Sequence, residues 1–223
     1  MKSIRLYFLL ILLFCFSSLF AQKELGSGML FPQFEKGTVV FKNGTQTAAS
    51  LNYNMMQQKM MFLNADSTLL AIANPSDILV VIIGERRFVP ASSNGYFYEE
   101  IEAGKGSFFV RRSAAMISAG KEAAYGGYSQ TSSVDSYSSW QGDGGSPVML
   151  KPNEKFNLEI EYSYYLKPGK SYKRFYSAKT LGKLFKGYES EIDNFAKEQS
   201  INFTKADDVA RIVEFGYSLA SKS

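Results

Sequence analysis

The sequence contains no histidine and only one cysteine, and these shortages exclude several kinds of active site. Histidine is the commonest general base and the commonest zinc ligand, so its absence excludes Ser-His and Cys-His catalytic pairs and most zinc sites. Cys15 lies inside an apolar N-terminal run, and no thiol follows it that could form a disulfide, bind a metal or act as a nucleophile. We therefore expect no metal and no cofactor.

The chain also lacks a large excess of charge of either sign. It has 25 basic and 21 acidic residues, a net charge of +4 at neutral pH. Nucleic-acid binding usually needs a much stronger positive field, so we expect no nucleic-acid partner.

Residues 1–21 have the composition of a secretory signal peptide. Lys2 and Arg5 precede an apolar run that begins at Leu6 and ends at Phe16, and Ala21 supplies the small residue before the predicted cleavage. The run is shorter than the roughly 20 residues that a membrane-spanning helix needs. We expect an exported protein, either periplasmic or associated with the outer membrane or extracellular, with no transmembrane segment after cleavage. A retained N-terminal anchor is the alternative.

Residues 22–118 are predicted to form a β-rich domain around one aliphatic run, Ile78–Ile83. Six consecutive aliphatic residues, most of them β-branched, suit a strand that is buried on both faces. Gly84 and Glu85 then predict a two-residue turn, after which the chain returns antiparallel. Similar patterns predict further strands at 38–42, 45–54, 59–63, 68–73, 96–102 and 107–112.

Residues 119–150 are predicted to be a Gly/Ser/aromatic loop. Within it, residues 119–147 hold seven serines and six glycines, and the aromatic residues are Tyr125, Tyr128, Tyr137 and Trp140. Aromatic side chains between small polar residues are typical of recognition loops, so these four are candidate ligand-binding residues. The alternative is a loop whose aromatic side chains anchor it to the protein body.

Residues 151–223 are predicted to form a β-hairpin and a helical cap that pack on the same domain. Residues 156–164 alternate between apolar and polar side chains, which indicates a half-buried strand, and residues 171–176 form its partner. Three helices follow. Ser177 is the predicted N-cap of the first, and Thr204 with Asp207 predicts a capping box for the last.

A basic segment overlaps this hairpin and the first helix. Residues 165–188 hold seven basic residues and no acidic residue. From this segment Lys170, Lys173 and Arg174 are candidate ligand-binding residues, because an anionic surface such as lipid headgroups would attract them. The alternative is a set of solvated charges that point in different directions.

Patterns that indicate catalysis are few, and we assign no catalytic residue. Carboxylate pairs occur at Glu99 with Glu100 and at Glu159 with Glu161, and glycoside hydrolysis needs two carboxylates about 5 to 10 Å apart across a cleft. A secreted hydrolase that uses such a pair on a carbohydrate is therefore the alternative to a role without catalysis.

Several segments resemble secreted envelope proteins of unknown function from Gram-negative bacteria. They are Leu51-Asn52-Tyr53-Asn54, the turn from Gly84 to Phe88, Ala124-Tyr125-Gly126, the segment from Lys179 to Leu184, and Asp207-Asp208. The resemblance implies no activity. The sequence as a whole predicts an α+β fold, with an antiparallel β-meander or sheet of about eight to ten strands followed by a small C-terminal helical cap. The expected role is binding or structural support in the cell envelope, with a protein, a glycan or an anionic lipid surface as partner.

Overall fold

The computed structural model describes residues 28–91, 95–118 and 156–221, together with three two-residue strands at 121–122, 128–129 and 136–137. The predicted signal peptide, residues 1–21, and most of the predicted loop, residues 119–150, lie outside the described residues. In the described part an antiparallel sheet is followed by three helices, which confirms the predicted α+β class. No helix in this part of the chain is long and apolar enough to span a membrane.

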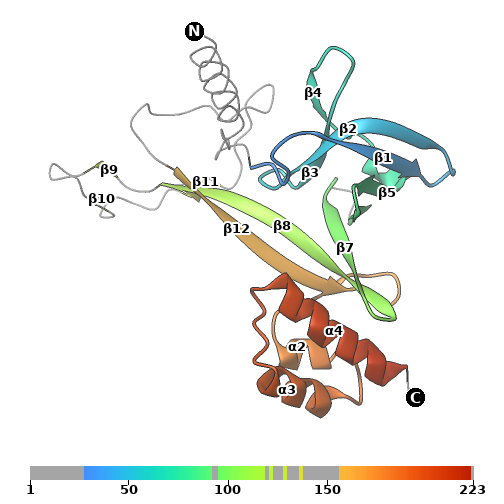
Figure 1. The fold of residues 1–223 in the computed structure, drawn as a ribbon, viewed down its shortest axis with the longest axis vertical. Helices are drawn as coiled ribbons and strands as arrows, with labels where there is room; N and C mark the ends of the chain where they lie inside the picture. Colours follow the sequence, from blue (N-terminus) through green and yellow to red (C-terminus); the bar gives the residue numbers. More distant parts are fainter. Residues whose placement is uncertain are drawn as a thin grey trace, which may run out of the picture.

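One antiparallel sheet of eleven strands runs through the molecule (Figure 1). From one edge to the other, ten of them are β13 (Lys173–Phe175), β12 (Phe156–Leu166), β8 (Gly106–Ser118), β7 (Phe97–Ala103), β6 (Arg86–Pro90), β5 (Ile78–Ile83), β1 (Glu35–Phe41), β2 (Gln46–Asn54), β3 (Lys59–Leu63) and β4 (Leu69–Ala71). The short β11 (Ser136–Tyr137) pairs with β8, and β9 (Lys121–Glu122) pairs with β10 (Tyr128–Ser129) in a separate ribbon. Most neighbours are consecutive in the chain, as in a meander, but β1 lies between β2 and β5.

The aliphatic strand β5 has the bounds that the sequence predicts. A 3-10 turn, η2 (Pro75–Asp77), leads into it, and the turn after it places Gly84 at a φ of 58°, a backbone conformation that glycine adopts without strain. The prediction that the whole strand is buried is wrong at Leu79, whose side chain is 55% exposed. The register between β1 and β5 shifts between Val40 and Phe41, and Leu79 is the extra residue of that bulge.

The strands before residue 118 curl around a hydrophobic core, which we call the curl core. Leu51, Tyr53 and Phe88 are almost fully buried in it, and the Tyr53 ring stacks on Phe88 with centroids 5.8 Å apart. The curl closes where the Ala114 N–H donates to the Met55 carbonyl at 3.1 Å. The first strands of the chain are therefore joined to the second half of β8.

A second cluster, the cap core, lies on the same face at the other end of β7, β8 and β12. Three helices cover it, α2 (Ala178–Gly182), α3 (Glu189–Glu198) and α4 (Ala206–Ala220), and Figure 1 shows them together at one end of the long strands. Phe175, Leu181 and Ile212 are completely buried here. Each such side chain contributes about 1.5 to 3 kcal/mol by leaving water, so the helices are held by this apolar contact.

The local signals at the helix starts are confirmed in one case and wrong in the other. Ser177 caps α2, and its side chain accepts a hydrogen bond from the Thr180 N–H. The predicted capping box of Thr204 and Asp207 does not form, because the Thr204 hydroxyl donates to the Asn202 side chain at 2.8 Å instead. Asp208, in the first turn of α4, accepts the N–H of Asn202 at 2.9 Å and so ties the helix to the segment before it.

Candidate functional site

The most distinctive surface is the outward face of β6, β7, β8 and β12, on the side of the sheet away from the two cores. The ladder aligns Arg87 with Glu100, Glu100 with Phe109, Phe109 with Tyr165 and Tyr165 with Arg174. Residues directly opposite each other in a sheet point to the same side. The five side chains therefore form one row across the face, charged at both ends and aromatic towards the middle.

Four aromatic rings gather on this row, and we call them the tyrosine cluster: Tyr98, Phe109, Tyr165 and Tyr172. Tyr98 and Tyr165 stack with centroids 4.8 Å apart, and the edge of Tyr172 meets Tyr98 at 5.0 Å and Phe109 at 4.9 Å. Tyr172 belongs to the turn between β12 and β13. Its ring contacts attach this turn to the sheet. The three tyrosines are half-buried, so each keeps part of its ring and its polar end near water.

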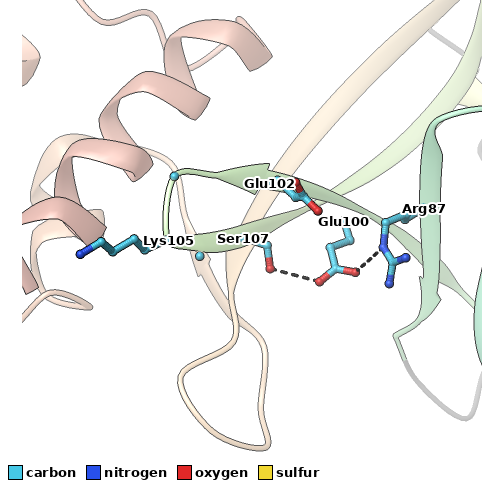
Figure 2. A pocket seen from close by; sticks show the side chains of 7 residues that line it. Arg87, Glu100, Glu102, Lys105 and Ser107 are labelled. Atoms are coloured by element: carbon cyan, nitrogen blue, oxygen red, sulfur yellow. Dashed lines mark hydrogen bonds and ion pairs between the residues drawn. The ribbon is translucent and has the colours of Figure 1, made fainter. Parts of the chain in front are cut away.

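A shallow hollow of about 420 Å³ lies beside the cluster, at the β7–β8 hairpin (Figure 2). We call it the charged hollow. Its lining consists of Arg87, Glu100, Glu102, Lys105 and Ser107 with Gly104 and Gly106. Figure 2 shows Glu100 between Ser107, whose hydroxyl donates at 3.1 Å, and Arg87, whose Nε lies at 3.3 Å. Lys105 points away and donates to the Ser221 hydroxyl at 3.2 Å.

The back of the hollow is fixed by helix α4. The Tyr217 hydroxyl donates to the Ser107 carbonyl at 2.9 Å, and the Tyr217 ring packs so closely on Gly106 that a Cβ there would overlap it. Gly104 turns the hairpin with a φ of 61°. The hollow is therefore built on rigid backbone, which favours a precise binding geometry.

The tyrosine cluster and the charged hollow are electrostatically connected. Burial raises the pKa of Tyr98 to about 12, and the neighbouring Tyr165 adds to the rise. Burial also raises the pKa of Tyr172, and the negative charge of Glu100 adds to it. These effects keep the hydroxyl groups of Tyr98 and Tyr172 protonated at neutral pH, so both tyrosines can donate hydrogen bonds to a ligand.

Two of the sequence-predicted ligand residues come near this surface. Arg174 is exposed, pairs with Tyr165 in the row, and lies 3.7 Å from Glu161. Lys170 is exposed in the turn that carries Tyr172. Lys173, by contrast, pairs with Leu166, which belongs to the cap core, so it lies on the other face.

The predicted aromatic residues of the 119–150 loop are not placed by the structure. Tyr125 and Trp140 lie outside the described residues, whereas Tyr128 and Tyr137 are described only through the backbone of β10 and β11. Their role in ligand binding stays a prediction.

The structure places the two carboxylate pairs considered for hydrolysis differently. Glu99 and Glu100 lie on opposite faces of β7, because neighbouring residues in a strand point to opposite sides. Glu159 and Glu161 share a face but are both exposed, opposite Ala115 and Ser113. A general acid also needs a raised pKa, and every carboxyl group with a resolved shift among the described residues, Asp66, Glu99 and Asp208, has its pKa lowered.

Glu99 is instead the centre of a buried ion cluster on the inner face. Arg86 reaches its two oxygens at 2.6 and 2.8 Å, and Nε of Arg112 lies at 2.7 Å. Burial raises the pKa of Glu99, but the hydrogen bonds and charges of the two arginines outweigh it and hold the pKa below its ordinary value. A carboxylate that is already saturated by two guanidinium groups is a structural element rather than a catalytic one.

The sequence reasoning missed Tyr98 and Glu102 as binding residues, considered Glu100 only for catalysis, and missed Tyr172. A signal for the first three is present in β7, where Phe97, Ile101 and Ala103 alternate with them. That alternation predicts an outward row, but it does not indicate which strands lie beside it.

Comparison of the chain with protein-family models, with curated proteins and with solved structures found no match.

Proposed function

We propose that this is an exported, non-enzymatic binding protein of the bacterial cell envelope, and that its binding surface is the outward face of β6, β7, β8 and β12. The observation that supports this most is the tyrosine cluster beside the charged hollow. Half-buried tyrosines held in fixed orientations, next to charged groups on rigid backbone, are the composition of recognition surfaces. The signal-peptide pattern of residues 1–21 supports export.

A hydrolytic function through a carboxylate pair is less well supported. It needs one carboxyl group that stays protonated near neutral pH and a second one across a cleft. Glu99 is fully engaged with Arg86 and Arg112, and the exposed pair of Glu159 and Glu161 lies on the sheet surface. Glu100, on the outward face, is held by the Ser107 hydroxyl and by Arg87, which suits a binding role better than that of a general acid.

Sedimentation with washed envelopes of the native cells tests the proposal. Each variant is expressed in cells that lack the wild-type copy, and the processed protein is purified from them. We expect saturable binding of the wild type and at least a tenfold weaker binding of Tyr172→Ala, because aromatic residues at the centre of a binding surface carry much of the affinity. Tyr176→Ala is the matched control, since Tyr176 is 67% exposed and lies outside the cluster.

Equal binding of Tyr172→Ala and the wild type would refute the assignment of the surface. Absence of the processed protein from periplasm, outer membrane and medium after cell fractionation would refute export. Circular dichroism of both variants shows that any loss of binding does not come from unfolding.

A further inference from the structure

The outward face carries charges of both signs. Arg87 is paired with Glu100, Arg174 lies near Glu161, and Lys167 lies over the Tyr172 ring at 4.9 Å. A polyanion would meet Glu100 and Glu102, and a cationic ligand would meet Arg87, so each would be repelled by part of the surface. The surface therefore favours a ligand without net charge.

The charged hollow also has unused hydrogen-bonding capacity of both kinds. Each oxygen of Glu100 accepts one hydrogen bond, from Ser107 or from Arg87, which leaves one further lone pair on each. Glu102 is exposed and makes no hydrogen bond or ion pair with any other described residue. Arg87 keeps donors that Glu100 does not use. Hydroxyl groups, which both donate and accept, suit this mixture, and two neighbouring hydroxyls match the two oxygens of a carboxylate.

The tyrosine cluster supplies the apolar part of the same surface. A sugar ring presents C–H groups on its faces and hydroxyls at its rim, and tyrosine offers a flat apolar ring with a polar end. Because Glu100 lies directly opposite Phe109 in the sheet, and the Tyr172 ring packs on Phe109 with centroids 4.9 Å apart, one ligand can reach both the Tyr172 ring and the Glu100 carboxylate. The hollow is open at its sides rather than enclosed, which suits a chain that passes across it.

We infer that the ligand is an uncharged glycan chain with neighbouring free hydroxyl groups, bound across the charged hollow and the tyrosine cluster. This inference rests on the proposed function. The carboxylates of Glu100 and Glu102 and the guanidinium of Arg87 hold the hydroxyls, and the rings of Tyr165 and Tyr172 pack on the sugar.

The same sedimentation assay tests the ligand class after selective treatment of the envelopes. Periodate cleaves the carbon–carbon bond between two hydroxyl-bearing carbons, and borohydride then reduces the aldehydes so that they cannot react with the protein. We expect periodate treatment to remove the binding, and treatment with proteinase K, followed by its inhibition, to leave it unchanged. Vesicles of phosphatidylethanolamine and phosphatidylglycerol are expected not to bind.

A charge-neutral substitution locates the glycan on the surface. Glu102→Gln keeps the shape of the side chain but removes a charged acceptor, and we expect roughly fivefold or greater weakening. Glu198→Gln is the matched control, because Glu198 is an exposed glutamate at the end of α3. If Glu102→Gln binds as strongly as the wild type, the glycan does not bind in the charged hollow.

The outcomes separate the two proposals. If periodate leaves the binding intact while Tyr172→Ala still weakens it, the glycan is wrong and the binding surface stands. If proteinase K removes the binding instead, the ligand is a protein. If the phospholipid vesicles bind the protein as strongly as the envelopes do, the ligand is a lipid. If the wild type does not sediment with any envelope fraction, both proposals fall.

Discussion

The curl core and the cap core share one face of β7 and β8, yet they are built differently. The curl core is closed by strands from distant parts of the chain, and it contains the Tyr53 hydroxyl, which donates to backbone carbonyl groups of other strands. The cap core is closed by three helices from the last part of the chain, and its buried members are almost all apolar. A sheet that closes on itself brings polar backbone and side chains inward, whereas helices that satisfy their own backbone can cover it with apolar side chains alone.

The boundary between the two cores is the ion cluster of Arg86, Glu99 and Arg112. Along β7 it separates Phe97 in the curl core from Ile101 beside the cap core. The prediction that the apolar face of β12 is buried is wrong at this boundary. Ile160 and Tyr162 lie between the two cores, and they are 39% and 37% exposed. The charge layer therefore divides one continuous sheet face into two hydrophobic units.

The largest effect is expected when this boundary is broken. Glu99→Gln leaves two arginines without their shared carboxylate, and loss of one partner from a buried ion pair costs about 3 kcal/mol of unfolding free energy. Urea unfolding followed by circular dichroism measures the loss. Glu100→Gln, on the outward face of the same strand, is expected to cost less than about 1 kcal/mol. Equal losses for the two variants would contradict the structural role of Glu99.

A second comparison adds one methyl group to each unit. In Gly37→Ala the new Cβ would lie 2.6 Å from the Ile82 carbonyl oxygen in the curl, whereas in Gly106→Ala it would overlap the Tyr217 ring on α4. Backbone cannot move aside as a side chain can. We expect Gly37→Ala to cost about 2 to 3 kcal/mol and Gly106→Ala about 1 kcal/mol, within the usual range for overpacking. The reverse order in urea unfolding would show that the cap is the more rigid unit.

Acid should weaken the boundary by a smaller amount than Glu99→Gln at neutral pH. The pKa of Glu99 is lowered in the folded protein, so the unfolded chain takes up the proton first as the pH falls. The stabilisation is therefore fully present above the ordinary glutamate pKa of 4.5 and is lost as the pH falls below it towards the folded value. Urea midpoints between neutral pH and about pH 3 should fall more steeply for the wild type than for Glu99→Gln. Parallel profiles would exclude Glu99 as the source.

The smallest effects are expected to differ in sign between the cores. In the curl core the Tyr53 hydroxyl lies 3.1 Å from the Arg112 carbonyl and 3.3 Å from the Phe97 carbonyl, so Tyr53→Phe should cost about 1 kcal/mol. In the cap core the buried Tyr164 hydroxyl has no hydrogen-bond partner among the described residues. Tyr164→Phe should therefore be neutral or stabilise by up to about 1 kcal/mol. A clear loss on thermal unfolding of Tyr164→Phe would reveal a partner for this hydroxyl.

Local sequence patterns predicted where the strands and helices begin and end better than they predicted which strands lie side by side. The bounds of β3 and β5 follow from their short apolar runs, and Ser177 identifies the start of α2. Nothing local indicates that β1 lies between β2 and β5, because alternation gives the faces of a strand but not the strand beside it.

The candidate site was only partly predictable for the same reason. Arg174 and Lys170 were found through their charge, but the tyrosine cluster needs residues from β7, β8, β12 and the following turn. One observation in the sequence was informative and was not used. Glu99 falls on the otherwise apolar side of β7, and a charge at such a position needs a buried partner.

The hydrogen bond between Ala114 and Met55 also affects the order in which the chain can fold. It joins residues that are far apart in the sequence, and the Tyr53 contact with Arg112 spans 59 positions. Such closures cost loop entropy before any contact compensates for it, so they slow folding. When the chain emerges N-terminus first, β1 to β7 can pair with one another, but their curl stays open until β8 has emerged. In a chain that ends at Ala103, the edge of β7 that β8 covers would be unpaired, and such edges readily pair with other chains.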